Sequence, residues 1–165
     1  MPPQKTSHHS DFYHPIAHSY TDYGNEAITD WKLGFLNVYK HLLPVKGKVI
    51  LDYGCGTGKF CRFLRDKGVE VIGVDISNSM LDIARSMDSR NIYYHLINSG
   101  HLEFIPSNSI DSITINFVLC ILNTQAEITK IVKELQRILK CVAMLAKDFR
   151  PSWPLKSARM DATSL

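Results

Sequence analysis

Val-Ile-Leu-Asp-Tyr-Gly-Cys-Gly-Thr-Gly, the stretch from residue 49 to residue 58, decides the fold of this chain. Its apolar, β-branched beginning predicts a buried strand, and the pattern of residues 59–67 predicts a helix after it. Between the two, Gly54, Gly56 and Gly58 occupy alternate positions. Glycine adopts backbone angles closed to other residues and lets the main chain approach a ligand closely. Because open α/β sheets bind ligands where a parallel strand runs into such a turn, we expect a ligand site here.

The spacing of these glycines excludes two common nucleotide-binding loops. The phosphate loop of nucleotide hydrolases has four residues between its first glycine and a Gly-Lys pair, and then Ser or Thr. Here three residues separate Gly54 from Gly58, and Phe60 stands where the hydroxyl residue should be. The dinucleotide fingerprint needs Gly or Ala where this sequence has Lys59. What remains is Asp-x-Gly-x-Gly-x-Gly from Asp52; a tight turn without a ligand is the alternative interpretation.

An acid closes the second predicted strand. Residues 69–75 form an apolar, β-branched run that ends in Asp75, 17 residues after Gly58. A carboxylate at the tip of this strand can accept hydrogen bonds from both ribose hydroxyls of an adenosine. Since NAD-dependent enzymes use an acid in the same way, Asp75 predicts an adenosine rather than a particular reaction.

Two motifs together resemble one family. The run Asp-x-Gly-x-Gly-x-Gly at residues 52–58 and the run Val-Asp-Ile-Ser-x-x-Met-Leu at residues 74–81 resemble the class I, Rossmann-like S-adenosylmethionine-dependent methyltransferases of the small-molecule type. The resemblance covers about residues 13–140. It implies an α/β three-layer sandwich, with a mostly parallel sheet and helices on both faces. It also implies S-adenosyl-L-methionine as cofactor and a small molecule as methyl acceptor.

The resemblance further implies a set of cofactor-binding positions. Tyr20 is the candidate for a lid over the cofactor, although the aromatic residues around it could equally cover the edge of the sheet. Ile76 and Met80 would pack on the adenine, although Met80 could also be plain core. The full set is Tyr20, Asp52, Gly54, Cys55, Gly56, Gly58, Asp75, Ile76, Met80, Asn98, Ser99, Asn116 and Phe117.

Two of these positions depart from the family pattern. The family has an acid and a small residue beside the adenine amino group, and here Asn98 and Ser99 stand there. An amide oxygen can accept the same hydrogen bond, without the charge. Asn116 is not followed by the Pro-Pro-aromatic sequence of enzymes that methylate amines of nucleic acids, which disfavours a DNA or RNA base as acceptor.

The other predicted elements complete a sheet of order 3-2-1-4-5 or less. Thr124 and Glu127 form a capping box, and Ser77 is a candidate cap of the helix after Asp75. Asp111 is expected to be a structural acid at a strand start. The elements are a helix at 27–43, a strand at 91–97, a fourth strand and its exit at 109–119, and a helix at 124–140.

The C-terminal part does not follow the family pattern. Residues 141–146 could form a fifth strand or extend the preceding helix, because no helix breaker separates them. We expect a disordered arm at 1–12, an incomplete methyltransferase domain at 13–146 and an irregular tail at 147–165. About 60 to 80 residues of a full domain would then be missing at the C-terminal end. The later strands would be among them, which leaves an exposed sheet edge where the protein could associate with itself.

The composition gives no reason to expect a nucleic-acid-binding, membrane-spanning or secreted protein. The chain has 165 residues, a net charge of +3 and Lys and Arg scattered along its length, so nothing predicts nucleic-acid binding. Its four cysteines form no Cys-x-x-Cys pair and indicate reduced thiols in a cytoplasmic protein. The longest apolar run, 110–122, contains polar residues, and residues 1–10 are polar, so neither a membrane span nor a secretory signal is expected. The histidines show no metal-binding spacing.

The expected chemistry needs little from side chains. The sulfonium of S-adenosylmethionine is already activated, so the protein mainly aligns the reactants and excludes water. His18, His95 and His101 are the available imidazoles, and nothing selects one as a base. Two alternatives stay open: a non-catalytic remnant of the fold, which binds the cofactor weakly or binds a partner protein, and an NAD-dependent oxidoreductase.

Overall fold

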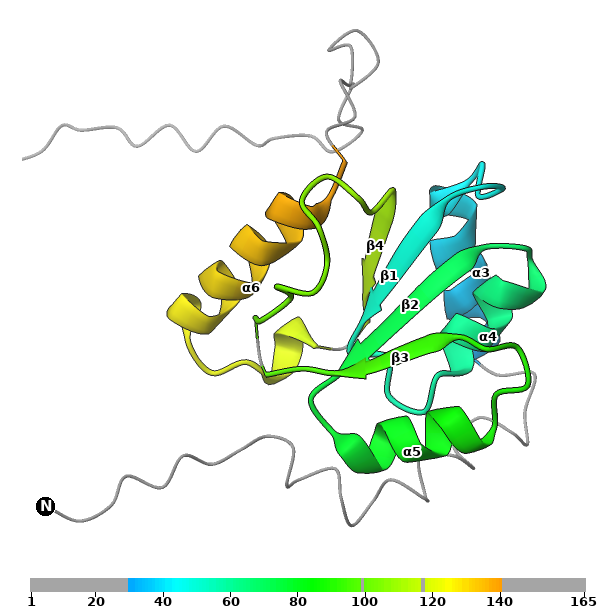
Figure 1. Cartoon of the computed structure of the whole chain (residues 1–165), viewed down its shortest axis with the longest axis horizontal. Coiled ribbons are helices and arrows are strands. Elements are labelled where there is room, and N and C mark those ends of the chain that lie inside the picture. The colour runs from blue at the N-terminus through cyan, green and yellow to red at the C-terminus, as the bar shows by residue number, and fades with distance from the viewer. Residues whose placement is uncertain (1–29, 99, 117, 141–165) are drawn as a thin grey trace, which may run out of the picture.

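A four-stranded parallel sheet forms the centre of the molecule (Figure 1). The computed structural model describes residues 30–98, 100–116 and 118–140. The elements are α3 (Asp30–Leu42), β1 (Val49–Tyr53), α4 (Lys59–Asp66), β2 (Glu70–Asp75), α5 (Asn78–Ser86), β3 (Tyr93–Leu96), β4 (Ser112–Ile115), the 3-10 helix η1 (Leu119–Ile121) and α6 (Gln125–Ile138).

The strand order is β3-β2-β1-β4, and every pair is parallel. Helices α3, α4 and α5 pack on one face of the sheet, and α6 packs on the other (Figure 1). This arrangement gives two hydrophobic cores, one on each side of the sheet. The predicted Rossmann-like α/β class and the first four places of the predicted strand order are confirmed.

Strand β1 lies in the middle because it is apolar on both faces. Ile50 belongs to the core under α4, whereas Leu51 belongs to the core under α6, and both are fully buried. Parallel sheets covered on both sides require such continuous apolar runs. The register places Asp52 between Gly73 of β2 and Thr114 of β4. A carboxylate is thereby held inside the sheet, two residues before the first glycine of the turn.

Local capping fixes where α5 and α6 begin. The hydroxyl of Ser77 accepts a hydrogen bond from the backbone N–H of Met80, as expected for an N-cap. Thr124 and Glu127 form both bonds of the predicted capping box. The structural role predicted for Asp111 is also confirmed, because its carboxylate accepts the N–H of Val49 at 2.9 Å.

Several predicted boundaries were too wide. The strand predicted at 91–97 is β3 at Tyr93–Leu96, and within the strand and exit predicted at 109–119 the strand is β4 at Ser112–Ile115. The helix predicted at 124–140 ends at Ile138, because Leu139 turns to an extended conformation and pairs in parallel with Ile110. The N–H of Lys140 then donates to the Ile110 carbonyl at 2.8 Å. The described residues therefore end in a parallel bridge with Ile110, two residues before β4.

Some predictions fall outside the described residues. They are the arm at 1–12, the tail at 147–165 and the fifth strand that is one interpretation of residues 141–146, together with Tyr20, Ser99 and Phe117. Self-association through the β4 edge likewise stays a prediction. Among residues 30–140, apart from 99 and 117, no helix combines the length and apolarity that a membrane crossing requires.

Candidate functional site

The glycine turn closes on the end of β2 through its own backbone. The N–H groups of Gly54 and Cys55 both donate to the Val74 carbonyl, at 2.8 and 3.0 Å. The N–H of Gly58 donates to the Cys55 carbonyl at 2.9 Å. Gly54, Gly56 and Gly58 have φ values of 78°, 53° and 72°, a region that favours glycine. The alternating glycines are thus required by the path of the backbone.

Asp75 joins the turn to the second strand. One carboxylate oxygen accepts the N–H of Gly56 at 2.8 Å, and the other accepts the N–H of Ser77 at 2.9 Å. The residue is 9% exposed. Burial raises the pKa of Asp75, while the hydrogen bonds from Ser77 and Gly56 act in the opposite direction. The carboxylate therefore faces the turn, where its oxygens are acceptors that a ligand hydroxyl could use.

Asp52 is a second acid beneath the same turn. It is 2% exposed; Thr114 Oγ1 donates to one carboxylate oxygen at 2.8 Å, and Cys61 Sγ donates to the other at 3.3 Å. Burial raises the pKa of Asp52 to about 6, with Thr114 and Cys61 opposing and Asp75 adding to the shift. The described residues form no ion pair with it. The turn is therefore built over two acids.

Side chains fill the space around two of the glycines and leave the third open. A Cβ atom on Gly54 would collide with Val118, and one on Gly58 would lie 2.5 Å from the hydroxyl oxygen of Tyr94. A Cβ atom on Gly56 would meet nothing within 4 Å. The accessible part of the turn thus lies at Gly56, next to the carboxylate of Asp75.

The loop after β3 is tied to β1. The N–H of Gly100 donates to the hydroxyl oxygen of Tyr53 at 3.0 Å, and Tyr53 is 3% exposed. The side chain of Asn98 is exposed, and the Asn98 carbonyl accepts the N–H of His101. Because β3 lies next to β2, this loop and the glycine turn leave the same edge of the sheet.

The remaining predicted positions differ in exposure. Ile76 is partly buried and packs against the core under α6, whereas Met80 is 3% exposed. Asn116, one residue after β4, is partly buried. Of the predicted set, the structure thus gathers Asp52, the three glycines, Cys55 and Asp75 at the turn.

Sequence reasoning missed four residues that build this site: Thr114, Cys61, Tyr53 and Tyr94. Thr114 could have been singled out from the sequence, because it is a polar residue between two isoleucines in β4. In the structure it pairs with Asp52 of β1. The other three carry no local signal. Their contacts join segments far apart in the chain and arise only once the strand register is set.

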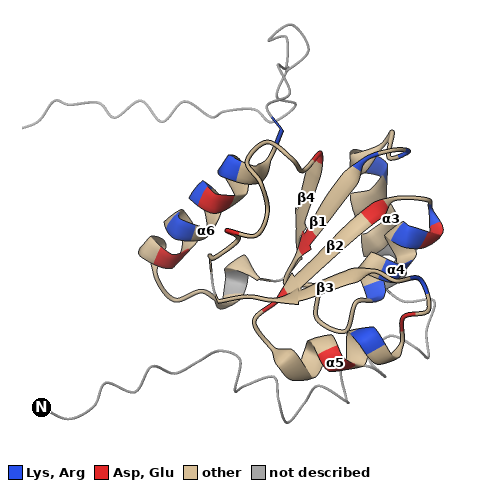
Figure 2. Ribbon diagram, viewed as in Figure 1, with Lys and Arg blue, Asp and Glu red and all other residues tan. Residues whose placement is uncertain are grey.

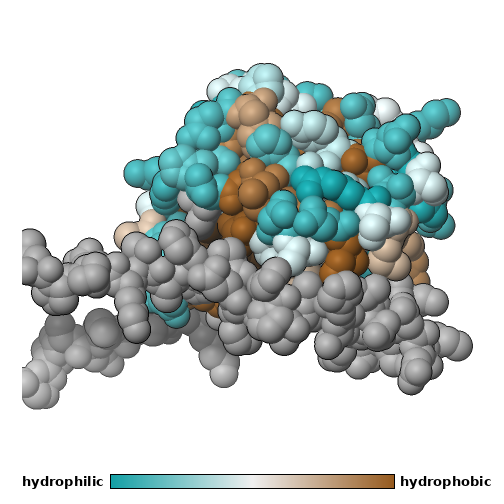
Figure 3. Space-filling model, turned by 60° about the horizontal axis from the view of Figure 1, so that its bottom comes forward, coloured by the Kyte–Doolittle hydropathy of each residue, from teal (hydrophilic) through white to brown (hydrophobic). Residues whose placement is uncertain are grey.

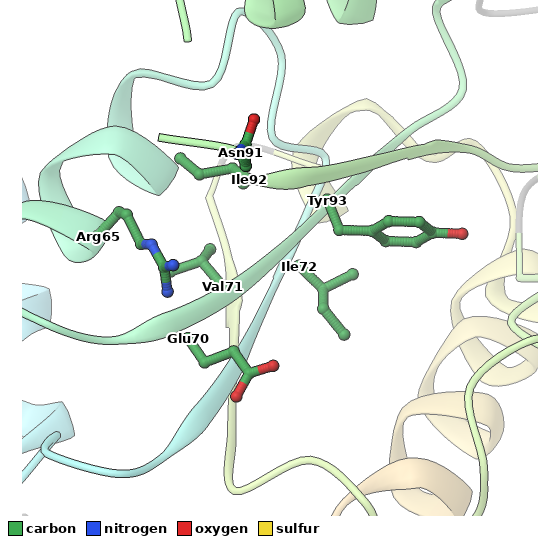
Figure 4. Close-up of a pocket in the computed structure, with 7 residues that line it drawn as sticks. All are labelled: Arg65, Glu70, Val71, Ile72, Asn91, Ile92 and Tyr93. Carbon is green, nitrogen blue, oxygen red and sulfur yellow. The ribbon is translucent and has the colours of Figure 1, made fainter. Parts of the chain in front are cut away.

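A hollow elsewhere among the described residues compares poorly with the glycine turn as a ligand site. This hollow, between the starts of β2 and β3, lies at the opposite end of these strands from the glycine turn, and its Tyr93 ring points away from Arg65 (Figure 4). Ligand sites usually have convergent polar groups, which this hollow lacks. No cluster of His, Cys, Asp and Glu suited to a metal ion occurs among the described residues. Hydrophobic residues on the face shown in Figure 3 form separate patches between hydrophilic ones.

Comparison with known proteins agrees with this geometry. A family profile described as "Methyltransferase domain" matches residues 51–146. N-demethylindolmycin N-methyltransferase of Streptomyces griseus is 33% identical over an alignment of 147 residues, and the match covers 84% of this chain and 61% of that protein. Demethylmenaquinone methyltransferase of Tropheryma whipplei is 43% identical over an alignment of 82 residues, and the match covers 48% of this chain and 34% of that protein.

Solved structures show the same relationship. Phosphoethanolamine N-methyltransferase 2 of Haemonchus contortus, in complex with S-adenosyl-L-methionine, matches 79% of this chain and 33% of its own with a TM-score of 0.61 and 26% identity. This chain spans about three fifths or less of the length of each of these three relatives. The profile match covers more than half of the chain and includes the glycine turn, both acids and β4. The chain therefore belongs to the class I S-adenosylmethionine-dependent methyltransferase family.

Proposed function

We propose that this chain binds S-adenosyl-L-methionine over the glycine turn and transfers its methyl group to a small-molecule acceptor. The observation that carries this proposal is the hydrogen bond from Gly56 N–H to Asp75, which brings the acid of β2 against the open part of the turn. A ribose seated there could donate a hydroxyl hydrogen bond to the Asp75 carboxylate. The adenosine would lie along the turn, toward the loop after β3.

The hydrogen bonds of the turn argue against a phosphate ligand. Phosphate-binding turns offer unpaired backbone N–H groups. Here the N–H groups of residues 54, 55, 56 and 58 all donate to protein acceptors. The two acids, Asp52 and Asp75, would repel a pyrophosphate at the same place. A ligand with hydroxyl donors and a positive charge fits better, which supports the sulfonium cofactor over NAD.

The chain's own groups would bind and align rather than exchange protons. The bound sulfonium supplies an activated methyl group. Asp75 would hold the ribose, the turn would set the direction of the sulfonium, and the loop anchored by Tyr53 would border the adenine. In this proposal Asn98, Ser99, Ile76 and Met80 lie near the adenine. Tyr20 would cover the cofactor as a lid, and Asn116 and Phe117 would lie where the cofactor meets the acceptor.

A small acceptor is supported by charge distribution. Lys and Arg are interspersed with Glu along α6, and the blue and red segments of the ribbon in Figure 2 are spread over several elements. Nucleic-acid binding usually requires a clustered basic face. The names of the Streptomyces griseus and Haemonchus contortus relatives also specify small molecules as their acceptors.

Calorimetric titration of the full chain tests the proposal. We expect S-adenosyl-L-methionine and S-adenosylhomocysteine to bind, and NAD not to bind. Asp75→Ala should weaken both ligands at least tenfold, because it removes the ribose acceptor and releases Gly56. Asp82→Asn, which changes an exposed acid on α5, should bind like the unchanged chain. Failure to bind either sulfur ligand would overturn the proposal, and binding without methyl transfer to any amine, hydroxyl or carbon acceptor would indicate the non-catalytic alternative.

A further inference from the structure

Tyr53 connects the glycine turn to the loop after β3. It is the last residue of β1, and the next residue, Gly54, begins the turn. Its side chain lies in the core under α6 and is 3% exposed. There the hydroxyl oxygen accepts the N–H of Gly100 at 3.0 Å, in a buried hydrogen bond. A phenylalanine ring would fill the same space without placing a polar group in an apolar core, so the hydroxyl serves the loop rather than the core.

The loop held by this bond is short and tightly turned. The N–H of His101 donates to the Asn98 carbonyl at 2.9 Å, which is the kind of bond that closes a β-turn. Gly100 has a φ of 72°, a region that favours glycine. Because the closing bond pairs only the outer residues of such a turn, the inner N–H of Gly100 needs an acceptor from elsewhere. Tyr53 supplies that acceptor.

Helix α6 contacts the same glycine from another side. A Cβ atom on Gly100 would lie 3.1 to 3.4 Å from side-chain carbons of Lys130, so the Lys130 stem occupies the place where a side chain would be. The amino group of Lys130 lies 2.7 Å from Nε2 of His101. The position of Gly100 is therefore fixed by Tyr53 through its N–H and by the Lys130 stem against its α-carbon.

This loop begins against the acid that faces the proposed ribose position. The N–H of Ile97 donates to the backbone carbonyl of Asp75 at 2.9 Å, and Asn98 follows directly. The side chain of Asn98 is exposed. An adenine whose ribose is held at Asp75 would reach the loop, where an amide group can pair with the edge of the base. Since such hydrogen bonds form only at about 2.7 to 3.2 Å, the position of the loop decides whether the base is recognised.

We propose that Tyr53 is a positioning residue for base recognition, whose hydroxyl holds Gly100 so that the loop selects adenine over other purines. This inference rests on the proposed function and adds a residue that does not itself touch the cofactor. Without the hydroxyl, Asp75 and the glycine turn would still bind the ribose and the amino-acid part. The loss is therefore expected in the preference for the base rather than in binding of every ligand.

Two ligands that differ only in the base test this proposal. S-inosylhomocysteine carries an oxygen in place of the adenine amino group of S-adenosylhomocysteine, so an acceptor replaces a donor at the edge of the base. We expect calorimetry on the unchanged chain to show about tenfold tighter binding of S-adenosylhomocysteine, the effect of about one good hydrogen bond. Tyr53→Phe keeps the ring in the core and should reduce this preference to about threefold or less.

Asp111→Asn is the matched control for a general loss of stability. It changes a contact at the other end of β1, where the Asp111 carboxylate accepts the N–H of Val49. This variant should also lower the unfolding free energy, yet it should keep the preference for adenine at about tenfold. An equal loss of preference in the two variants would show that Tyr53 acts only through stability, and the inference would be wrong.

Hydrogen exchange supplies a measurement that needs no variant. The Gly100 amide of the unchanged chain should exchange at least about tenfold more slowly than in an unstructured chain, and unprotected exchange would contradict the inference. A preference that survives in Tyr53→Phe, or two ligands that bind the unchanged chain equally well, would also contradict it and leave the proposed function standing. If the unchanged chain binds neither ligand, the inference and the proposed function both fail.

Discussion

The hydroxyl oxygen of Tyr94 lies 2.5 Å from the position that a Cβ atom on Gly58 would occupy. Tyr94 belongs to β3, and its ring also lies against Gly73 of β2. The aromatic side chain thus supports the glycine turn from below, across two strands. Its hydroxyl is buried and has no hydrogen-bond partner among the described residues. The ring therefore limits what can replace Gly58, and the hydroxyl can be removed without breaking a hydrogen bond to a described residue.

The close contact at Gly58 predicts that an alanine there lowers the unfolding free energy more than an alanine at another glycine with a similar φ. Gly58 and Gly68 have φ values of 72° and 78°, but a Cβ atom on Gly68 would meet nothing within 4 Å. Both alanine variants carry similar backbone strain, of about 1 kcal/mol. Gly58→Ala should lose a further ~1 to 3 kcal/mol of unfolding free energy, because the methyl group collides with the Tyr94 ring. Urea unfolding measures both, and equal losses would contradict the contact.

Because the Tyr94 hydroxyl has no hydrogen-bond partner among the described residues, we expect Tyr94→Phe not to lower the unfolding free energy. Removing a buried hydroxyl that has no partner should leave the unfolding free energy unchanged or raise it by about 1 kcal/mol. Tyr53→Phe is the matched variant, because the Tyr53 hydroxyl accepts the N–H of Gly100. That variant should lose about 1 to 2 kcal/mol, since it leaves a buried N–H without an acceptor. Similar losses in the two variants would show that Tyr94 has a partner after all.

The parts of the fold that rest on local pattern could be predicted from the sequence. The glycine turn, the acid at the end of β2, the Ser77 cap and the capping box of α6 each depend on residues close together in the chain. The strand order followed from the resemblance. The carboxylate of Asp75 faces the turn as the motif implies, because the parallel register of β1 and β2 carries both strand ends to one edge.

The parts that rest on contacts between distant segments could not be predicted. The end of α6 was placed too late because the pairing of Leu139 with Ile110 overrides a sequence that has no helix breaker. Nothing near Asp52 in the sequence shows that Thr114 and Cys61 will be its partners, since each comes from another element. The special environment of this acid exists only in the folded chain.

The open space at Gly56 predicts a variant that affects binding more than stability. A methyl group on Gly56 would meet no protein atom within 4 Å, so Gly56→Ala should lose about as much stability as Gly68→Ala. The same methyl group would project into the proposed cofactor seat. Affinity for S-adenosylhomocysteine should therefore fall at least tenfold, while Gly68→Ala binds normally. Unchanged affinity in Gly56→Ala would place the ligand elsewhere.

The contacts of Asp111 predict that it stabilises the folded chain at neutral pH and that this stabilisation is lost in acid. Its carboxylate accepts the Val49 N–H and pairs with Lys140, and these contacts hold its pKa below the ordinary value of 3.8. A lowered pKa means that the stabilisation is complete above 3.8 and disappears as the pH falls through the folded-state pKa. Asp111→Asn should therefore be less stable than the unchanged chain at pH 7, by about 1 kcal/mol, and equally stable in strong acid. A difference that does not shrink in acid would exclude the charge as its source.

Asp52 predicts the opposite pH dependence, because burial raises its pKa from 3.8 to about 6. The folded chain holds this proton more tightly than the unfolded chain, so the stabilising contribution is complete below pH 3.8 and is lost as the pH rises through 6. Asp52→Asn cannot ionise and keeps its contribution at every pH. Its unfolding free energy, relative to the unchanged chain, should therefore rise by about 2 to 3 kcal/mol between pH 4 and pH 7.5. Urea unfolding at the two pH values measures this change, and any constant cost of replacing the Cys61 contact cancels between them. A relative stability that is the same at both pH values would mean that Asp52 is ionised throughout, and the buried acid would then need a cation that the described residues do not supply.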